Sequence, residues 1–242
     1  MSMEISRRLL FGLPLAAQAQ TSGQTLNVVV AGGHPDDPET GAGGTMARYA
    51  QVGHRVTSLY LTRGEAGIRG ASHGEAARIR TAEAEAACRI LRARPVFAGQ
   101  VDGAAEINGG RYDAFRKLLE EIAPDIVFTH YPIDTHRDHR AVSDLVYDAL
   151  LRMKRKFSLY YFEVLTGEQT QTFHPSDYVD ITETEPLKRK ACFAHKSQGP
   201  ESFYPYHETM SRFRGMECGV KHAEAFLSHA ANARAAETVR GL

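Results

Sequence analysis

Histidine and aspartate are concentrated in two short runs of this 242-residue chain. The first run contains His34, Asp36 and Asp37 and follows an apolar stretch, whereas the second comes much later and contains His136 and His139. A hydrolytic Zn²⁺ site takes about three His or carboxylate ligands and leaves one position for water. The residue types in the two runs therefore predict a divalent metal site that activates water.

The two runs suggest a division of roles between metal ligands and a general base. In this interpretation His34, His139 and one of Asp36 or Asp37 hold the metal. A metal lowers the pKa of its bound water, so the remaining aspartate can remove the proton as general base. The residues alone leave open which aspartate has which role.

His136 and Asp138 suit a second role, in stabilising charge. A carboxylate that is hydrogen-bonded to one imidazole nitrogen fixes the ring and favours its protonated form. We therefore expect Asp138 to orient His136. A protonated His136 would stabilise a developing oxyanion or protonate a leaving amine. His130, which precedes this run, is expected to be structural.

Strand and helix patterns alternate from residue 26 onward. Strands are predicted at 26–31, 55–61, 95–98, 125–129 and 159–164, and helices at 43–52, 74–92, 115–122 and 142–150. This order predicts an α/β fold, with a Rossmann-like, doubly wound, mostly parallel sheet of order 3-2-1-4-5 and helices on both faces. The first and fourth strands are neighbours in that order, so the two His/Asp runs should meet at the crevice between their carboxyl ends.

The last part of the chain is less regular. We predict a strand at 178–181 and helices at 186–196 and 207–220, which extend the sheet edge and wall the pocket. No linker or repeat divides the chain, so residues 20–242 are expected to form a single domain.

The first 19 residues have the pattern of a signal peptide. Arg7 and Arg8 precede a short apolar stretch, and Ala17 and Ala19 provide small residues for cleavage. Paired arginines are typical of a twin-arginine signal, so we expect an exported, periplasmic or extracellular protein. The apolar stretch is about half the ~20 residues that a membrane span needs, which argues against stable membrane insertion.

The composition excludes several classes of partner and site. The chain has 29 basic and 29 acidic residues, so neither nucleic acid nor an anionic membrane is favoured as partner. The three cysteines are scattered and have no CxxC spacing, so neither a disulfide framework nor a thiolate metal site is predicted.

Three further residues are candidates for substrate binding. Arg63 and Glu65 follow the second predicted strand and lie on the rim where the metal site is expected, and His195 is a third candidate. The charged run at residues 78–85 is expected to be a solvated helix face with spaced ion pairs.

In the two His/Asp runs the chain resembles the LmbE/PIG-L family of zinc-dependent deacetylases, which act on N-acetylglucosamine-type groups. The resemblance extends over nearly all of the chain beyond the leader and also includes residues 41–45, 62–67, 194–198 and 223–226. It implies a metal held by His34, Asp37 and His139, with Asp36 as general base. It also implies Zn²⁺, with Fe²⁺ as the alternative, and a small-molecule or glycan substrate that carries an N-acetyl amino sugar.

The sequence departs from the family pattern at two places, and other functions remain open. Pro38 follows the two aspartates, and Asp134 stands where some sugar-thiol members have tyrosine. The alternatives are an amidase on a related sugar-linked amide, a non-haem Fe(II) oxygenase and a catalytically silent sugar-binding protein. Family members are often oligomeric, so a homo-oligomer is also compatible with the resemblance.

Overall fold

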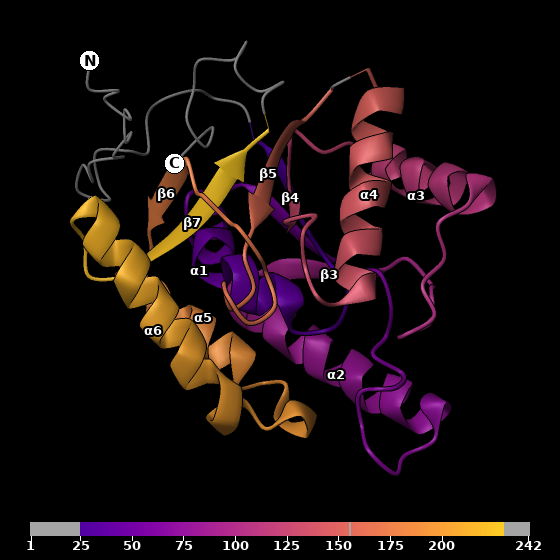
Figure 1. Ribbon diagram of the computed structural model, residues 1–242, viewed down its shortest axis with the longest axis horizontal. Helices are drawn as coiled ribbons and strands as arrows, with labels where there is room; N and C mark the ends of the chain where they lie inside the picture. Colours follow the sequence, from indigo (N-terminus) through magenta and orange to yellow (C-terminus); the bar gives the residue numbers. More distant parts are fainter. Residues whose placement is uncertain (1–24, 155, 230–242) are drawn as a thin grey trace.

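In the computed structural model, residues 25–154 and 156–229 are described, and within them seven strands form one sheet with helices on both faces (Figure 1). The strands are β1 (Asn27–Gly32), β2 (Arg55–Tyr60), β3 (Ala93–Phe97), β4 (Ile126–His130), β5 (Ser158–Phe162), β6 (Asp177–Asp180) and β7 (Ala223–Ser228). The helices are α1 (Asp37–Gln51), α2 (His73–Leu91), α3 (Gly109–Ile122), α4 (Arg137–Arg152), α5 (Glu185–Cys192), the 3₁₀ helix η1 (Lys196–Gln198) and α6 (Pro200–Cys218).

The sheet has the strand order β3-β2-β1-β4-β5-β7-β6. Strands β1 to β5 pair in parallel, whereas β7 is antiparallel to both β5 and β6. The α/β class and the predicted order 3-2-1-4-5 are thus confirmed. Because Ala31 of β1 pairs with Thr129 of β4, these two strands end side by side, and the loops that follow them share one edge of the sheet.

Both faces of the sheet are buried, as the continuous apolar run of β1 requires. Val28 and Val30 belong to the cluster that packs beneath α1, whereas Val29 and Ala31 face the cluster of α3 and α4. Side chains of a strand alternate between faces, and only helices on both sides can bury all of them. Complete burial of each valine side chain contributes about 1.5–3 kcal/mol, so β1 is firmly anchored below the site.

Helix α1 begins at Asp37, earlier than the predicted start at residue 43. The glycines that follow in this helix serve close packing. A Cβ atom at Gly41 would lie 2.4 Å from the ring of Phe162, and one at Gly44 would lie 2.7 Å from Ile181. The glycines therefore let α1 approach the sheet, and the first turn of this helix carries Asp37 into the site.

The C-terminal part differs from the prediction in three ways, the first being that α5 ends at Cys192 rather than at residue 196. Strand β7 was not predicted, because its alanines have low strand propensity and Glu224 interrupts the apolar run. The Glu224 charge is nevertheless buried, since it pairs with Lys188 and accepts backbone N–H bonds from Gly44 and Thr45. Helix α6 begins at Pro200 rather than residue 207.

Two predictions about targeting and the membrane concern different parts of the chain. The signal peptide expected at residues 1–19 lies outside the described residues. Within the described residues, no helix combines the length and the apolar character that crossing a membrane requires.

Candidate active site

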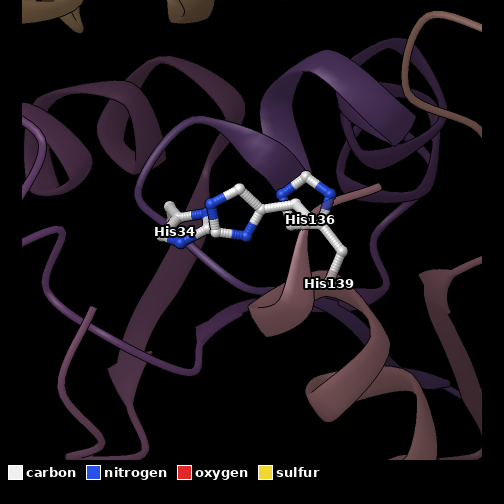
Figure 2. A group of neighbouring side chains, drawn as sticks. All are labelled: His34, His136 and His139. Atoms are coloured by element: carbon white, nitrogen blue, oxygen red, sulfur yellow. The ribbon is translucent and has the colours of Figure 1, made fainter. Parts of the chain in front are cut away.

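The two His/Asp runs meet at the carboxyl ends of β1 and β4, as the strand order predicts. His34 lies in the loop between β1 and α1, and His136 is the residue that caps the N-terminus of α4. Figure 2 shows their rings gathered with that of His139, which lies in the first turn of α4. The ring centroid of His136 lies 4.5 Å from that of His34 and 4.7 Å from that of His139. Chain segments distant in sequence therefore form one compact site.

The side chains of His34, Asp37 and His139 meet at the loop between β1 and α1. His34 Nδ1 lies 3.2 Å from one carboxylate oxygen of Asp37, and His139 Nε2 lies 3.3 Å from the other. All three residues are buried. Two imidazole nitrogens and a carboxylate are the donor set that divalent zinc takes in catalytic sites, so these residues fit a metal ion by their chemistry.

The electrostatics of the three residues also favour a cation. Burial opposes ionisation of Asp37, but the neighbouring rings of His139 and His130 outweigh it and hold the pKa of this carboxyl well below its usual range. Burial likewise opposes charge on His139, yet Asp37 outweighs it and raises the pKa of His139 to about 9. The carboxylate thus attracts positive charge, which a divalent ion supplies when it displaces the imidazole protons.

The second ring nitrogen of each candidate histidine ligand faces a carboxylate other than that of Asp37. His139 Nδ1 lies 3.1 Å from Asp134 Oδ1. His34 Nε2 lies 3.1 Å from Asp102 Oδ1 and 3.2 Å from Asp138 Oδ2. A carboxylate behind a metal-binding histidine fixes its orientation and increases its basicity. Both rings are therefore held with one nitrogen toward Asp37.

Asp138 does not orient His136 through its carboxylate, contrary to expectation. Its carboxylate lies beside His34, and among the described residues it makes no hydrogen bond to His136. Instead the backbone N–H of Asp138 donates to His136 Nδ1, because His136 caps the start of α4. Burial, and then the nearby rings of His34 and His139, lower the pKa of His136. This ring is accordingly a neutral N–H donor through Nε2 rather than an imidazolium.

His130 belongs to the site more closely than its expected structural role implied. It is fully buried, and its ring stacks on His139 at a centroid distance of 3.9 Å. Its Nε2 accepts the backbone N–H of Gly33 and lies 3.3 Å from Asp37 Oδ2. Burial lowers the pKa of His130 to about 4, so the ring is neutral. His130, Asp37 and His139 form one of three overlapping groups of metal-binding side chains among the described residues. His34 belongs to the other two, with His136 and His139 or with Asp102 and Asp138.

Asp36 lies beside the metal-binding groups but is bound elsewhere. Its backbone is in the left-handed region, with φ 119°, which turns the chain sharply between Pro35 and Asp37. Its Oδ2 lies 3.0 Å from Arg80 Nη2, and its side chain lines the cavity. Burial raises the pKa of the Asp36 carboxyl, and Arg80 opposes that rise. Asp36 is thus a carboxylate of increased basicity at the cavity wall, as a general base requires.

The charged run on α2 is only in part the solvated face that was expected, because Arg78 and Glu85 are exposed whereas Arg80 and Glu83 are not. Arg80 is buried, because Gly64 on the facing loop leaves room for it: a Cβ at Gly64 would lie 2.4 Å from Arg80 Nη1. Glu83 accepts hydrogen bonds from both the backbone N–H and the hydroxyl of Ser197. Arg80 therefore supports Asp36 in the site, and Glu83 ties α2 to η1.

Arg63, Glu65 and His195 are not among the described residues that line the cavity. Arg63 is exposed, with its guanidinium 5.2 Å from the centroid of the Phe97 ring. Glu65 accepts the backbone N–H of Asp102 and so supports the rim. His195 is fully buried, with Nε2 3.4 Å from Glu39 Oε2. Direct contact of these three residues with substrate therefore stays a prediction that this geometry does not favour.

The site opens into a cavity of about 500 Å³. Besides the groups discussed above, its wall contains Asp102, Gln198 and an arc formed by Thr40, Val164, Leu165, Gln169, Phe203 and His207. Asp102 and His207 had been missed, because neither has a spacing to other residues that singles it out. Tertiary packing alone brings them to the site.

A family model described as PIG-L, GlcNAc-PI de-N-acetylase, matches residues 28–150 of the chain. This range includes β1 to β4 and both His/Asp runs. The matched half of the chain therefore contains every candidate metal ligand.

Known relatives are similar over most of their length. The probable N-acetyl-alpha-D-glucosaminyl L-malate deacetylase 2 of Bacillus anthracis is 28% identical over 183 residues, 71% of this chain and 81% of the relative. The diacetylchitobiose deacetylase of Thermococcus kodakarensis is 26% identical over 215 residues, 79% of this chain and 78% of the relative. The solved structure of N,N'-diacetylchitobiose deacetylase from Pyrococcus horikoshii, in complex with an inhibitor, superposes with a TM-score of 0.73 at 26% identity, and covers 84% of this chain and 83% of that one.

Proposed function

Because the chain belongs to the PIG-L family, we propose that it is a metal-dependent deacetylase that hydrolyses the acetyl amide of an N-acetylated amino sugar or glycoconjugate. The observation that carries this proposal is the convergence of His34, Asp37 and His139 beside the carboxylate of Asp36 at the cavity wall. The relatives support an N-acetylglucosamine type of substrate, since their names specify a glucosaminyl malate and diacetylchitobiose.

His34, Asp37 and His139 would hold the metal in this proposal. Zn²⁺ is the ion proposed and Fe²⁺ is the alternative, because both accept imidazole and carboxylate ligands. When bound, such an ion supplies a water of lowered pKa and polarises the acyl carbonyl. Asp134 and Asp138 keep the two histidines in place through their other nitrogens.

Two side chains act on the reacting groups. Asp36 accepts a proton from the attacking water, since it is a carboxylate at the cavity wall with a raised pKa. His136 donates a hydrogen bond from Nε2 to the carbonyl oxygen as negative charge develops there. The protonated Asp36 then returns its proton to the nitrogen as the C–N bond breaks. One water is consumed, and acetate and a free amine are released.

An acetate-release screen tests the proposal. The chain from residue 20 onward is reconstituted with Zn²⁺ or with Fe²⁺ and incubated with N-acetylglucosamine, diacetylchitobiose and N-acetylglucosaminyl conjugates. We expect equimolar acetate and amine from at least one of them, loss of activity with a chelator, and recovery on metal addition. A fully metal-loaded, folded protein that releases no acetate from any of them would contradict the proposal.

The same screen separates the alternatives. An amidase on another sugar-linked amide would release a different acid together with the amine. A catalytically silent sugar-binding protein would bind these sugars without turnover. The Fe(II) oxygenase is disfavoured, because such sites usually lie on all-β jelly rolls, and this chain has a doubly wound α/β sheet. Oxygen consumption with 2-oxoglutarate would be its signature.

We propose in addition that residues 1–19 direct export to the periplasm or beyond. The proposal rests on Arg7 and Arg8 before the apolar stretch and on the small residues at the cleavage site. Expression of the full chain in a bacterium should yield a periplasmic product that starts at residue 20. Replacement of both arginines with lysine should retain the protein inside, and unchanged export would argue against the twin-arginine route.

A further inference from the structure

His207 on α6 is buried at the cavity, and no described residue is its hydrogen-bond partner. Its side chain is 5% exposed and lines the wall of the active-site cavity. Within residues 25–154 and 156–229, its Nδ1 is fully buried and unpaired, and no partner is found for Nε2. A polar group left without a partner inside a protein is costly. Nδ1 is enclosed by protein, whereas Nε2 is not fully buried and is the atom that a molecule in the cavity can reach.

The charged groups near His207 are already paired with one another. Lys188 Nζ lies 2.6 Å from Glu224 Oε1, and Arg214 Nε lies 2.6 Å from Glu163 Oε1. These four residues line, with His207, a small void of about 20 Å³ behind the cavity wall. Because each charge is satisfied by its partner, none of them provides a hydrogen bond to the imidazole.

The surroundings of His207 suit a sugar ring. Phe203, one turn earlier on α6, meets the His207 ring edge-on at a centroid distance of 5.9 Å. Val164 and Leu165 line the same cavity. A wall that combines these apolar side chains with polar groups such as His207 and Gln169 matches the chemistry of a pyranose, which has C–H faces and hydroxyl groups around its rim.

The ring of His207 is neutral in this environment. Burial and the positive charge of Lys188 lower the pKa of His207 to about 3, and Asp37 opposes this only in part. A neutral imidazole has one donor and one acceptor nitrogen. It therefore complements a hydroxyl group, which both donates and accepts, and offers no charge to an anionic ligand.

We propose that His207 is a specificity-determining residue whose imidazole hydrogen-bonds a hydroxyl group of the amino sugar in the cavity. This inference rests on the proposed function and deepens it. Residues 164–207 lie beyond the range 28–150 that the family model matches. The metal-binding residues thus belong to the part shared with the family, whereas this wall belongs to the part in which substrate choice can differ.

The test combines enzyme variants with substrate analogues. The probes are the methyl glycoside of N-acetylglucosamine and its three mono-deoxy analogues, each with the zinc-loaded protein. The variants are His207→Phe, which keeps a ring without polar atoms, and His207→Asn, which restores a donor and an acceptor. Tyr206→Phe is the matched control, because Tyr206 is exposed on the same helix and does not line the cavity. Metal content and thermal unfolding verify that each variant is folded.

We expect the wild type to lose about ten-fold or more in kcat/KM for one deoxy analogue, mainly through KM. In His207→Phe the kcat/KM for the parent sugar should fall to that for the analogue. The ratio of the two kcat/KM values should then be less than about two-fold. His207→Asn should recover part of the preference for the parent sugar, and Tyr206→Phe should show the same preference as the wild type. Discrimination that persists in His207→Phe, or is absent from the wild type, would overturn the inference and leave an internal water as the partner of His207.

This experiment separates the inference from the proposed function. Failure of the wild type to release acetate from any of the four sugars, and from the sugars and conjugates of the acetate-release screen, speaks against the proposed function alone. In that event, isothermal titration calorimetry of the same sugars with the zinc-loaded wild type and His207→Phe decides the inference. The preference for the parent sugar over one deoxy analogue should then appear in the Kd values of the wild type. Equal affinities in the two proteins for every sugar would overturn it.

Discussion

Arg80 Nη2 lies 3.0 Å from Asp36 Oδ2, so a buried guanidinium on α2 holds the proposed general base in place. Burial raises the pKa of Asp36, and the charge of Arg80 opposes that rise. Removal of Arg80 should therefore raise the pKa of Asp36 further. A base of higher pKa becomes protonated, and inactive, at a higher pH.

We predict that Arg80→Met moves the acid limb of the kcat/KM profile to higher pH and decreases kcat by about 10²-fold, with metal retained. Arg80→Lys keeps the charge but not the planar fork, so its shift should be smaller. The pH profiles of both variants and of wild type are the measurement. An acid limb that stays in place in Arg80→Met would show that Arg80 does not act on Asp36.

Asp134 should control metal affinity without contacting the metal. Its Oδ1 lies 3.1 Å from His139 Nδ1, and its other oxygen accepts the hydroxyl of Thr170. Asp134→Asn removes the negative charge behind His139, so zinc affinity should fall about 10–100-fold. Competition with a chromophoric chelator measures this, with Thr170→Val as the control for the second contact. Equal zinc affinity in Asp134→Asn and wild type would contradict the assigned geometry.

Substitutions at Asp138 and at His136 should have different effects, the first on metal binding and the second on kcat. The Asp138 carboxylate lies beside His34, so Asp138→Asn should weaken metal binding by about 10-fold or more. His136→Ala should leave the metal in place and decrease kcat by about 10²-fold or more, because it removes the oxyanion donor. Zinc titration and kcat on the same preparations test both. If Asp138→Asn binds zinc normally but shows the kinetic defect of His136→Ala, Asp138 orients His136 as the sequence analysis expected, and the assignment to His34 is wrong.

His207 should make the protein sensitive to acid. Its pKa is lowered to about 3 in the folded chain, against 6.5 for an ordinary histidine. The unfolded chain therefore binds more protons between these values, and the free energy of unfolding falls as pH decreases below about 6.5. His207→Phe lacks this group. Between about pH 7 and pH 4 its free energy of unfolding should therefore fall by ~3 kcal/mol less than that of the wild type. Urea unfolding of both proteins, with Tyr206→Phe as control, is the measurement. Parallel losses in wild type and His207→Phe would contradict the burial of a neutral His207.

The part of the fold that positions the site follows from simple patterns in the sequence. The alternation of apolar strands with helices predicts the order of the first five strands, and this order alone brings His34 to His139. Strand β7 could not be predicted, because its buried Glu224 is stabilised by Lys188 on a different element. Such a pair is visible only once the chain is folded.

The site itself could be predicted only in part. His34, Asp37 and His139 are recognisable by residue type and by their position after two strands, although the choice between the aspartates came from the family resemblance. Arg80 and Asp102 give no such signal. Arg80 resembles any helix-surface arginine until Gly64 is seen to make room for it. Residues that reach a site through tertiary packing alone leave no local pattern.

The central claim is that the metal and the general base belong to separate residues of one site. Zinc content and acetate release, measured together in Asp36→Ala and His139→Ala, test it most directly. Asp36→Ala should bind one zinc per chain and lose about 10²–10⁴-fold in kcat, whereas His139→Ala should lose zinc and activity together. Full activity in Asp36→Ala, or undiminished zinc binding in His139→Ala, would contradict the account.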